Sequence, residues 1–177
     1  MKISTRQVAM CAVLTALALG LSTLENLFPV TLFIPLPGVK LGLANIVTVF
    51  ALYQLGAAPA LCILTARCLL GSLFAGNASA LLFSLLGGVL AMLVMMALTR
   101  LRGLSVYGVS IGGAAAHNIG QMAAALITLG NTAVLGYLPF LLAVSLFTGA
   151  LTGFVSALLL RAMSHVKLSH GRSADNG

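Results

Sequence analysis

The sequence predicts an all-α integral membrane protein, a bundle of six transmembrane helices whose N- and C-termini both face the cytoplasm. Of the 177 residues, 60% are hydrophobic and only 6% are charged, whereas soluble domains carry about 25% charged residues. Because so few charges cannot cover a surface that faces water, the expected solvent is lipid. The apolar runs are long and continuous, which favours helices over the alternating strands of a membrane barrel.

Glycine, proline and asparagine residues divide these runs into six segments, each interpreted as one membrane span. The expected spans are residues 5–24, 41–55, 58–75, 78–99, 109–129 and 140–163. The first segment is long enough to cross the bilayer and has no convincing cleavage site, so we expect a retained helix and no cleaved signal peptide. Residues 1–163 are therefore predicted to form a single transmembrane domain, and residues 164–177 a flexible cytoplasmic tail.

A Pro-rich segment, residues 25–40, separates the first two spans. Its prolines, Pro29, Pro35 and Pro37, exclude a regular helix. Irregular backbone at membrane depth persists only where protein covers it. We therefore expect an outer loop that lies against the helices.

The orientation is predicted from the basic residues. With six spans, most of the nine Lys and Arg residues fall in cytoplasmic segments, namely Lys2, Arg6, Arg100, Arg102, Arg161, Lys167 and Arg172. Lys40 alone falls in an outer loop, as the positive-inside rule allows. The net charge of +7 is thus explained by topology. No basic patch carries interleaved aromatic residues, so membrane lipid is an expected partner and nucleic acid is not.

One cation, Arg67, lies in the middle of the expected third span, in the stretch LCILTARCLLGSL. An arginine at the bilayer centre costs about 2.5–3.5 kcal/mol on insertion scales. The chain has two acidic residues, Glu25 and Asp175, and Asp175 falls in the tail. Two interpretations stay open: a structural pair of Arg67 with Glu25 or with backbone carbonyls, or a site for an anionic ligand.

Further polar residues accompany this arginine. Lys40 and Asn45, near the start of the second span, fall on the same outer side as Glu25. In the fifth span, His117 and Gln121 share a helix face at i, i+4 spacing, with Asn118 beside them. The structural alternative is an interfacial anchor for Lys40, a solvated helix end for Glu25, and interhelical hydrogen bonds for the three residues of the fifth span. The predicted substrate-binding residues are Glu25, Lys40, Asn45, Arg67, His117, Asn118 and Gln121.

Two stripes of small residues recur at four-residue spacing. They are Ala12, Ala16 and Gly20 in the first span, and Ser145, Gly149 and Gly153 in the sixth. Such stripes allow helix backbones to approach closely in lipid. They indicate either packing within the bundle or docking of a partner membrane protein, and docking is assigned to Ala12, Ala16 and Gly20.

The sequence lacks the residue patterns that catalysis and metal binding require. No aspartate precedes Asp175, so the chain cannot build the Asp-rich clusters that hold Mg²⁺ on a diphosphate. No GxxxxGK[ST] motif is present for ATP, and His117 has no carboxylate in its segment. The three cysteines lie in apolar segments without CxxC spacing and are interpreted as buried apolar residues. We expect no enzyme, cofactor, disulfide or metal site.

Three stretches carry a family resemblance: TRQVAMCAVLTALALGLSTLE, LPGVKLGLANIVTVFAL and GAAAHNIGQM. They resemble the heptaprenyl diphosphate synthase component I family, also called the Gx transporter family, over about residues 5–160. That family is similar to the S components of energy-coupling factor (ECF) transporters. The resemblance implies six helices, an outward-facing pocket capped by the loop after the first helix, and docking onto a transmembrane coupling subunit driven by two ATPases.

Two main functions remain open at this point. The first is a substrate-binding subunit in the cell membrane for uptake of a small anionic or amphipathic molecule, with residues 26–38 as a lid. The second is a non-catalytic membrane component of prenyl diphosphate or quinone metabolism. A structural or assembly protein, in which every polar residue serves packing, is the third reading.

Overall fold

In the computed structural model the backbone is described for residues 5–27 and 42–172, and side chains for 5–25 and 42–163. This part of the chain is all-helical, as the sequence predicts. The elements are α1 (Thr5–Leu27), α2 (Asn45–Leu55), α3 (Ala57–Ala75), α4 (Ala78–Leu98), α5 (Val106–Leu129), the 3-10 helix η2 (Thr132–Tyr137) and α6 (Leu138–Arg172).

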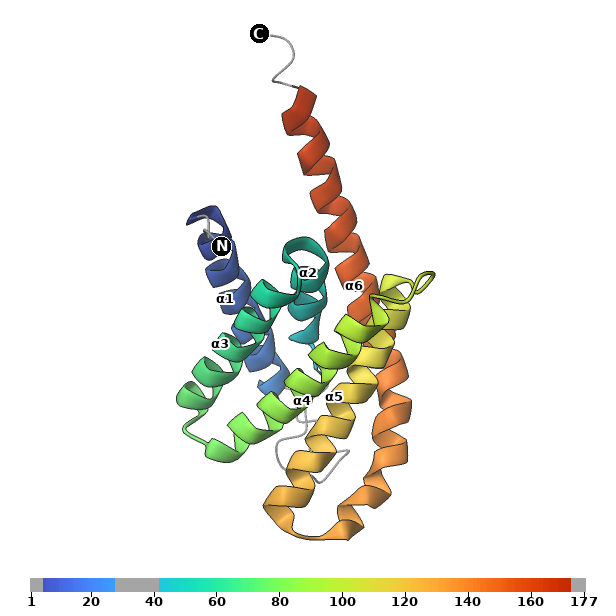
Figure 1. Cartoon of the computed structure of the whole chain (residues 1–177). Helices are drawn as coiled ribbons and strands as arrows, with labels where there is room; N and C mark the ends of the chain where they lie inside the picture. Colours follow the sequence, from blue (N-terminus) through green and yellow to red (C-terminus); the bar gives the residue numbers. More distant parts are fainter. Residues whose placement is uncertain (1–4, 28–41, 173–177) are drawn as a thin grey trace.

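The helices form one bundle in which α4, α5 and α6 pack side by side and α1 packs mainly on α3 (Figure 1). The short helix α2 lies between these groups and contacts α3 and α6. Glycines bring the α4–α5–α6 layer together. A Cβ added at Gly120 would clash with the backbone carbonyl of Leu86, and one at Gly149 would lie 2.6 Å from the Cα of Ile111. Such close approach substitutes for the hydrophobic driving force that lipid does not supply.

Local sequence signals set several helix ends. Gly76 ends α3 in the left-handed conformation, with φ of 60°, which glycine adopts without a steric penalty. Asn77 then caps α4, because its side-chain oxygen accepts a hydrogen bond from the N–H of Ser79 at 2.9 Å. Ser105 caps α5 in the same way through the N–H of Gly108. These caps produce tight connections between neighbouring helices.

The second helix differs from its expected span. Helix α2 begins at Asn45 and has 11 residues, about 16 Å at 1.5 Å per residue, which is roughly half of a 30 Å hydrocarbon core. Residue 41, the expected start of this span, lies outside the described residues. Gly42 has a φ of 86°, and its N–H binds a side chain of α1, so the chain turns here before the helix begins.

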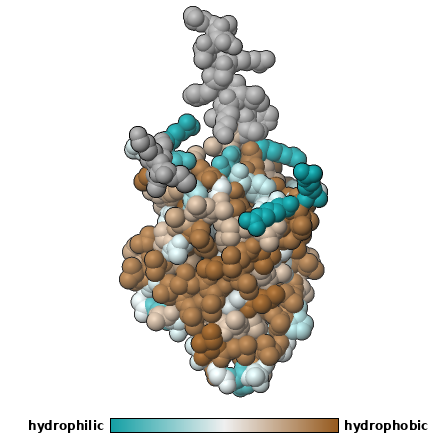
Figure 2. Space-filling view, in the orientation of Figure 1, coloured by the Kyte–Doolittle hydropathy of each residue, from teal (hydrophilic) through white to brown (hydrophobic). Residues whose placement is uncertain are grey.

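Four helical segments of the described chain are long and apolar enough to cross a membrane: Thr5–Glu25, Ala57–Ala75, Ala78–Leu98 and Thr132–Met163. Helix α5 has 24 residues, the length of a span, but is not among the four. Hydrophobic side chains cover the visible surface between the two ends of the bundle, and hydrophilic ones gather at the end that carries the N-terminus of α1 (Figure 2). The chain is thus a membrane-embedded protein, while the six-span count and the orientation stay predictions.

The sixth helix continues beyond the expected end of its span at residue 163 and reaches Arg172. No proline or glycine interrupts residues 163–170, so nothing in the local sequence forces the helix to stop at the apolar boundary. The polar tail therefore begins as helical backbone. Its flexibility stays a prediction.

Candidate functional site

The predicted site residues fall into two separate places in the bundle. One is a buried polar cluster at the start of α2, where α1, α4 and α5 meet. The other is a pocket between α1, α3 and α4 that contains Arg67. Lys40 and most of the Pro-rich segment lie outside the described residues.

Glu25 holds the start of α2. Its side chain is 3% exposed, and its carboxylate accepts hydrogen bonds from the N–H groups of Gly42 at 2.5 Å and Leu43 at 3.2 Å. The N-terminus of a helix carries a partial positive charge that favours an anion at this place. The carboxylate of Glu25, one of the structural partners considered for Arg67, thus holds the turn before α2.

His117 lies between this turn and α4. A Cβ added at Gly42 would lie 3.2 Å from Nδ2 of Asn45 and 3.5 Å from Cδ2 of His117. On the other side, a Cβ at Gly87 would lie 3.0 Å from Nδ1 of His117 and 3.1 Å from Cγ of Gln121. All three polar side chains are buried, and Oδ1 of Asn45 has no hydrogen-bond partner among the described residues. The structure thus brings Asn45, His117 and Gln121 together.

Asn118 faces a different neighbour. Its Nδ2 donates a hydrogen bond to the backbone carbonyl of Leu141 at 2.8 Å and so joins α5 to α6. Adjacent residues on a helix are about 100° apart, so Asn118 and His117 face different helices. The structure does not bring Asn118 into the cluster around the start of α2.

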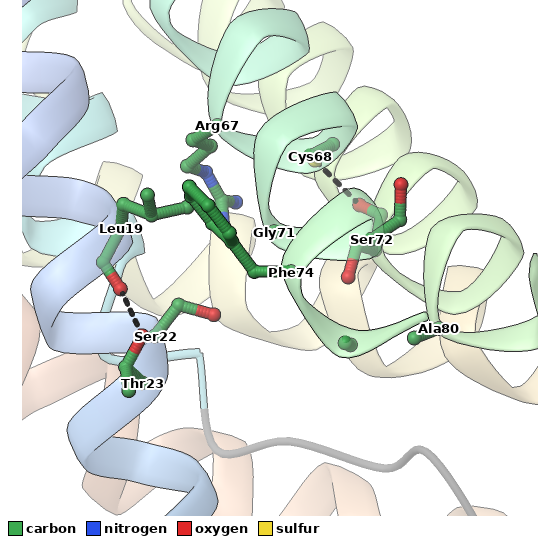
Figure 3. Close-up of a pocket in the computed structure, with 11 residues that line it drawn as sticks. Leu19, Ser22, Thr23, Arg67, Cys68, Gly71, Ser72, Phe74 and Ala80 are labelled. Carbon is green, nitrogen blue, oxygen red and sulfur yellow. Dashed lines mark hydrogen bonds between the residues drawn. The ribbon is translucent and has the colours of Figure 1, made fainter. Parts of the chain in front are cut away.

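Arg67 lines a pocket of about 290 Å³ between α1, α3 and α4 (Figure 3). Small and weakly polar residues form much of its wall, among them Ser22 and Thr23 of α1, Gly71 and Ser72 of α3, and Ser84 of α4. Figure 3 shows Arg67 of α3 and Leu19 of α1 extending toward the same space. The volume is near the lower limit of the range typical of small-molecule sites.

The guanidinium of Arg67 is buried and incompletely paired. Its side chain is 7% exposed, and its Nε has no hydrogen-bond partner among the described residues. A Cβ added at Gly88 would lie 3.5 Å from Nη2. Gly87 faces His117 and the next residue, Gly88, faces Arg67, so α4 separates the two polar sites. The seven predicted residues therefore do not form one site.

The hydroxyl groups of the pocket were not among the predicted site residues. Thr23 donates to the carbonyl of Leu19 at 2.9 Å, and Ser72 donates to that of Leu69 at 2.8 Å. Serine and threonine commonly bond their own helix backbone in this way, so their presence in a span is a weak signal in the sequence. Only the packing of α1 and α4 against α3 shows that these oxygens surround an arginine.

The two stripes of small residues have different environments. Ala12, Ala16 and Gly20 are exposed on α1, and a Cβ added at Gly20 would meet nothing within 4 Å. In contrast, Ser145, Gly149 and Gly153 are buried. The α6 stripe therefore serves packing against α5, while the α1 stripe is exposed on the surface of the described chain.

Among the described residues, no group of three or more His, Cys, Asp or Glu side chains is arranged to hold a metal ion.

No curated protein and no solved structure matches the chain. A family model described as heptaprenyl diphosphate synthase component I matches residues 14–159, a range that includes Glu25, Arg67 and His117. The chain belongs to the heptaprenyl diphosphate synthase component I family.

Proposed function

We propose that the chain is the substrate-binding subunit of a membrane transport system for uptake of a small anionic or amphipathic molecule. One observation carries the proposal: Arg67 is buried in a pocket among apolar helices, and its Nε has no partner among the described residues. A buried cation is costly unless an opposite charge or hydrogen bonds compensate it. An anionic substrate supplies both.

The cluster around the start of α2 has a second role in this proposal. Glu25 anchors the turn that follows the Pro-rich segment, so it connects the expected lid to the bundle. Asn45, His117 and Gln121, which α4 separates from Arg67, remain candidates for a second polar contact site, together with Lys40. Asn118 is assigned to the α5–α6 contact because its amide already binds Leu141.

Energy for uptake would come from other subunits. The sequence has no ATP-binding loop of the GxxxxGK[ST] type. The exposed stripe of Ala12, Ala16 and Gly20 on α1 offers a surface to which another membrane helix can approach closely. We assign this surface to the docking of a transmembrane coupling subunit that works with two ATPases. The proposed location of the chain is the cell membrane.

A second candidate function rests on the family description. The words "component I" describe one part of a heptaprenyl diphosphate synthase, which implies association with a further component. With two acidic residues in the whole chain, the carboxylate clusters that bind Mg²⁺ and diphosphate would have to come from that partner. In this alternative the chain is a non-catalytic membrane component of prenyl diphosphate or quinone metabolism.

Native mass spectrometry of the tagged chain, extracted gently from its own membrane, separates the two candidates. The transport proposal expects a coupling subunit, ATPases and a small anion to accompany the wild-type chain. Arg67→Ala should lose the anion and keep the subunits, whereas Arg102→Ala, which removes an exposed loop cation, should lose neither. A soluble prenyl diphosphate synthase as the accompanying protein would instead establish the alternative.

A further inference from the structure

The pocket around Arg67 has a definite direction. Arg67 lies about two turns before Ala75, the last residue of α3, which is about 12 Å along the helix axis. Phe74, Ala75 and Ala80 also line the pocket. Phe74 is 78% exposed, so the pocket extends from the buried guanidinium to the α3–α4 turn. Figure 1 shows this turn at the end of the bundle away from the N-terminus of α1.

The described residues that line the pocket carry a single charge. Arg67 is the one charged residue among the described residues that line it. A single guanidinium neutralises one negative charge, and in a low-dielectric interior any further charge on the ligand would need a counter-charge that the described lining does not contain. This balance favours a monoanion, such as a carboxylate, over a diphosphate.

Hydrogen-bond donors and acceptors lie at different places in the pocket. The hydroxyls of Thr23 and Ser72 already donate to backbone carbonyls, so toward a ligand they present oxygen lone pairs. Arg67, in contrast, presents only donors. An anionic group therefore fits at Arg67, and neutral O–H or N–H groups fit beside Thr23 and Ser72.

We infer that the pocket binds a monoanion whose charged group enters first and reaches Arg67, while its less polar body extends toward the α3–α4 turn. This inference rests on the proposed function and specifies its substrate class. Gly71 forms part of the pocket wall between Arg67 and the α3–α4 turn. Gly71 lies beside Leu19, where an added Cβ would be 3.5 Å from Cδ1 and would meet no backbone atom of another helix within 4 Å, so a larger side chain at position 71 narrows the pocket.

A charge-selective labelling experiment tests the inference without knowledge of the substrate. In a full-length chain with Cys11, Cys62 and Cys68 changed to alanine, Ser72→Cys provides a thiol in the pocket wall. The purified protein is treated with two methanethiosulfonates of similar size, one carrying a sulfonate and one a quaternary ammonium group. Labelling rates are followed by mass spectrometry with Arg67, Arg67→Lys and Arg67→Gln. A matched chain that keeps only Cys62, exposed on the same helix, is the control.

With Arg67 or Arg67→Lys, the ratio of anionic to cationic labelling at position 72 should exceed that in Arg67→Gln by about tenfold, because nearby charge of one sign attracts the other. The ratio at Cys62 should not change among the three, and a single symmetrical size-exclusion peak shows that each variant is folded. Equal ratios at position 72 with Arg67 and Arg67→Gln would overturn the inference. So would a thiol at position 72 that neither reagent labels while Cys62 reacts.

Competition then tests the ligand class. Hexanoate should slow labelling at position 72 more than 1-hexanol does, since both have the same apolar chain and only hexanoate has the charge. Gly71→Leu should remove this protection while Arg67 is kept. Hexanol protecting as well as hexanoate, or pyrophosphate protecting better than hexanoate, would refute a monoanion site.

The transport proposal and this inference can fail separately. Labelling and competition use the isolated chain and need no coupling subunit. If native mass spectrometry finds a prenyl synthase partner while hexanoate still protects position 72, the transport function fails and the monoanion site remains. If a coupling subunit and ATPases accompany the chain but pyrophosphate is the best competitor, the inference fails and the transport function remains.

Discussion

Glu25→Gln provides a direct measure of how strongly α1 holds the start of α2. The wild-type carboxylate accepts two backbone N–H groups, from Gly42 and Leu43. Glutamine has a single acceptor oxygen, so one charge-assisted hydrogen bond is lost, at about 1.5–3 kcal/mol. Loss of the negative charge at the N-terminus of α2 removes about 0.3–1 kcal/mol more. The expected loss of unfolding free energy is therefore about 2–4 kcal/mol.

Thermal unfolding in detergent, followed with a thiol-reactive fluorophore, measures this effect because Cys68 is buried in the folded chain. A change of about 1 kcal/mol shifts Tm by about 2–4 °C in a chain of this size, so Tm should fall by about 4–16 °C. Asp175→Asn, the same carboxylate-to-amide change at the only other acidic residue, is the control. If Glu25→Gln and Asp175→Asn unfold at the same temperature as the wild type, the carboxylate does not hold the turn.

Three further substitutions test the packing and the pocket. Gly120→Ala should lower Tm strongly, because its Cβ would clash with the backbone of α4, whereas Gly20→Ala, which meets nothing within 4 Å, should not; equal Tm values would disprove the close α4–α5 contact. Asn118→Ala should cost about 1 kcal/mol of unfolding free energy by removing the hydrogen bond to Leu141, and an unchanged Tm would show that this bond contributes nothing. Gly71→Ala should keep or slightly raise Tm, because alanine is the better helix former, and it should weaken the protection of position 72 by hexanoate. A fall of several degrees in Tm would show that position 71 is closely packed.

The two polar sites differ in how far they are enclosed by helices. Asn45, His117 and Gln121 are enclosed by α2, α4 and α5, and Gln121 is 0% exposed. The pocket of Arg67 instead reaches the α3–α4 turn through Phe74 and Ala80. The pocket of Arg67 therefore reaches the end of the bundle, while Gly42, in the turn held by Glu25, lies against His117.

Much of the architecture follows from the sequence alone. A chain with so few charges needs lipid as its solvent, and in lipid the backbone must satisfy its own hydrogen bonds, which leads to helices. Gly76 with Asn77, and Ser105, mark helix ends through local chemistry that requires no knowledge of the rest of the fold. Arg67 stands out as anomalous because its cost depends on the apolar residues beside it in the chain.

The grouping of the polar residues was decided only by tertiary structure. Hydropathy does not distinguish a side chain that faces lipid from one that faces another helix, because both environments are apolar. The rotation of each helix about its axis therefore had to come from packing. That rotation places His117 and Arg67 on different sides of α4, leaves Ala12, Ala16 and Gly20 exposed, and directs Glu25 to the turn before α2.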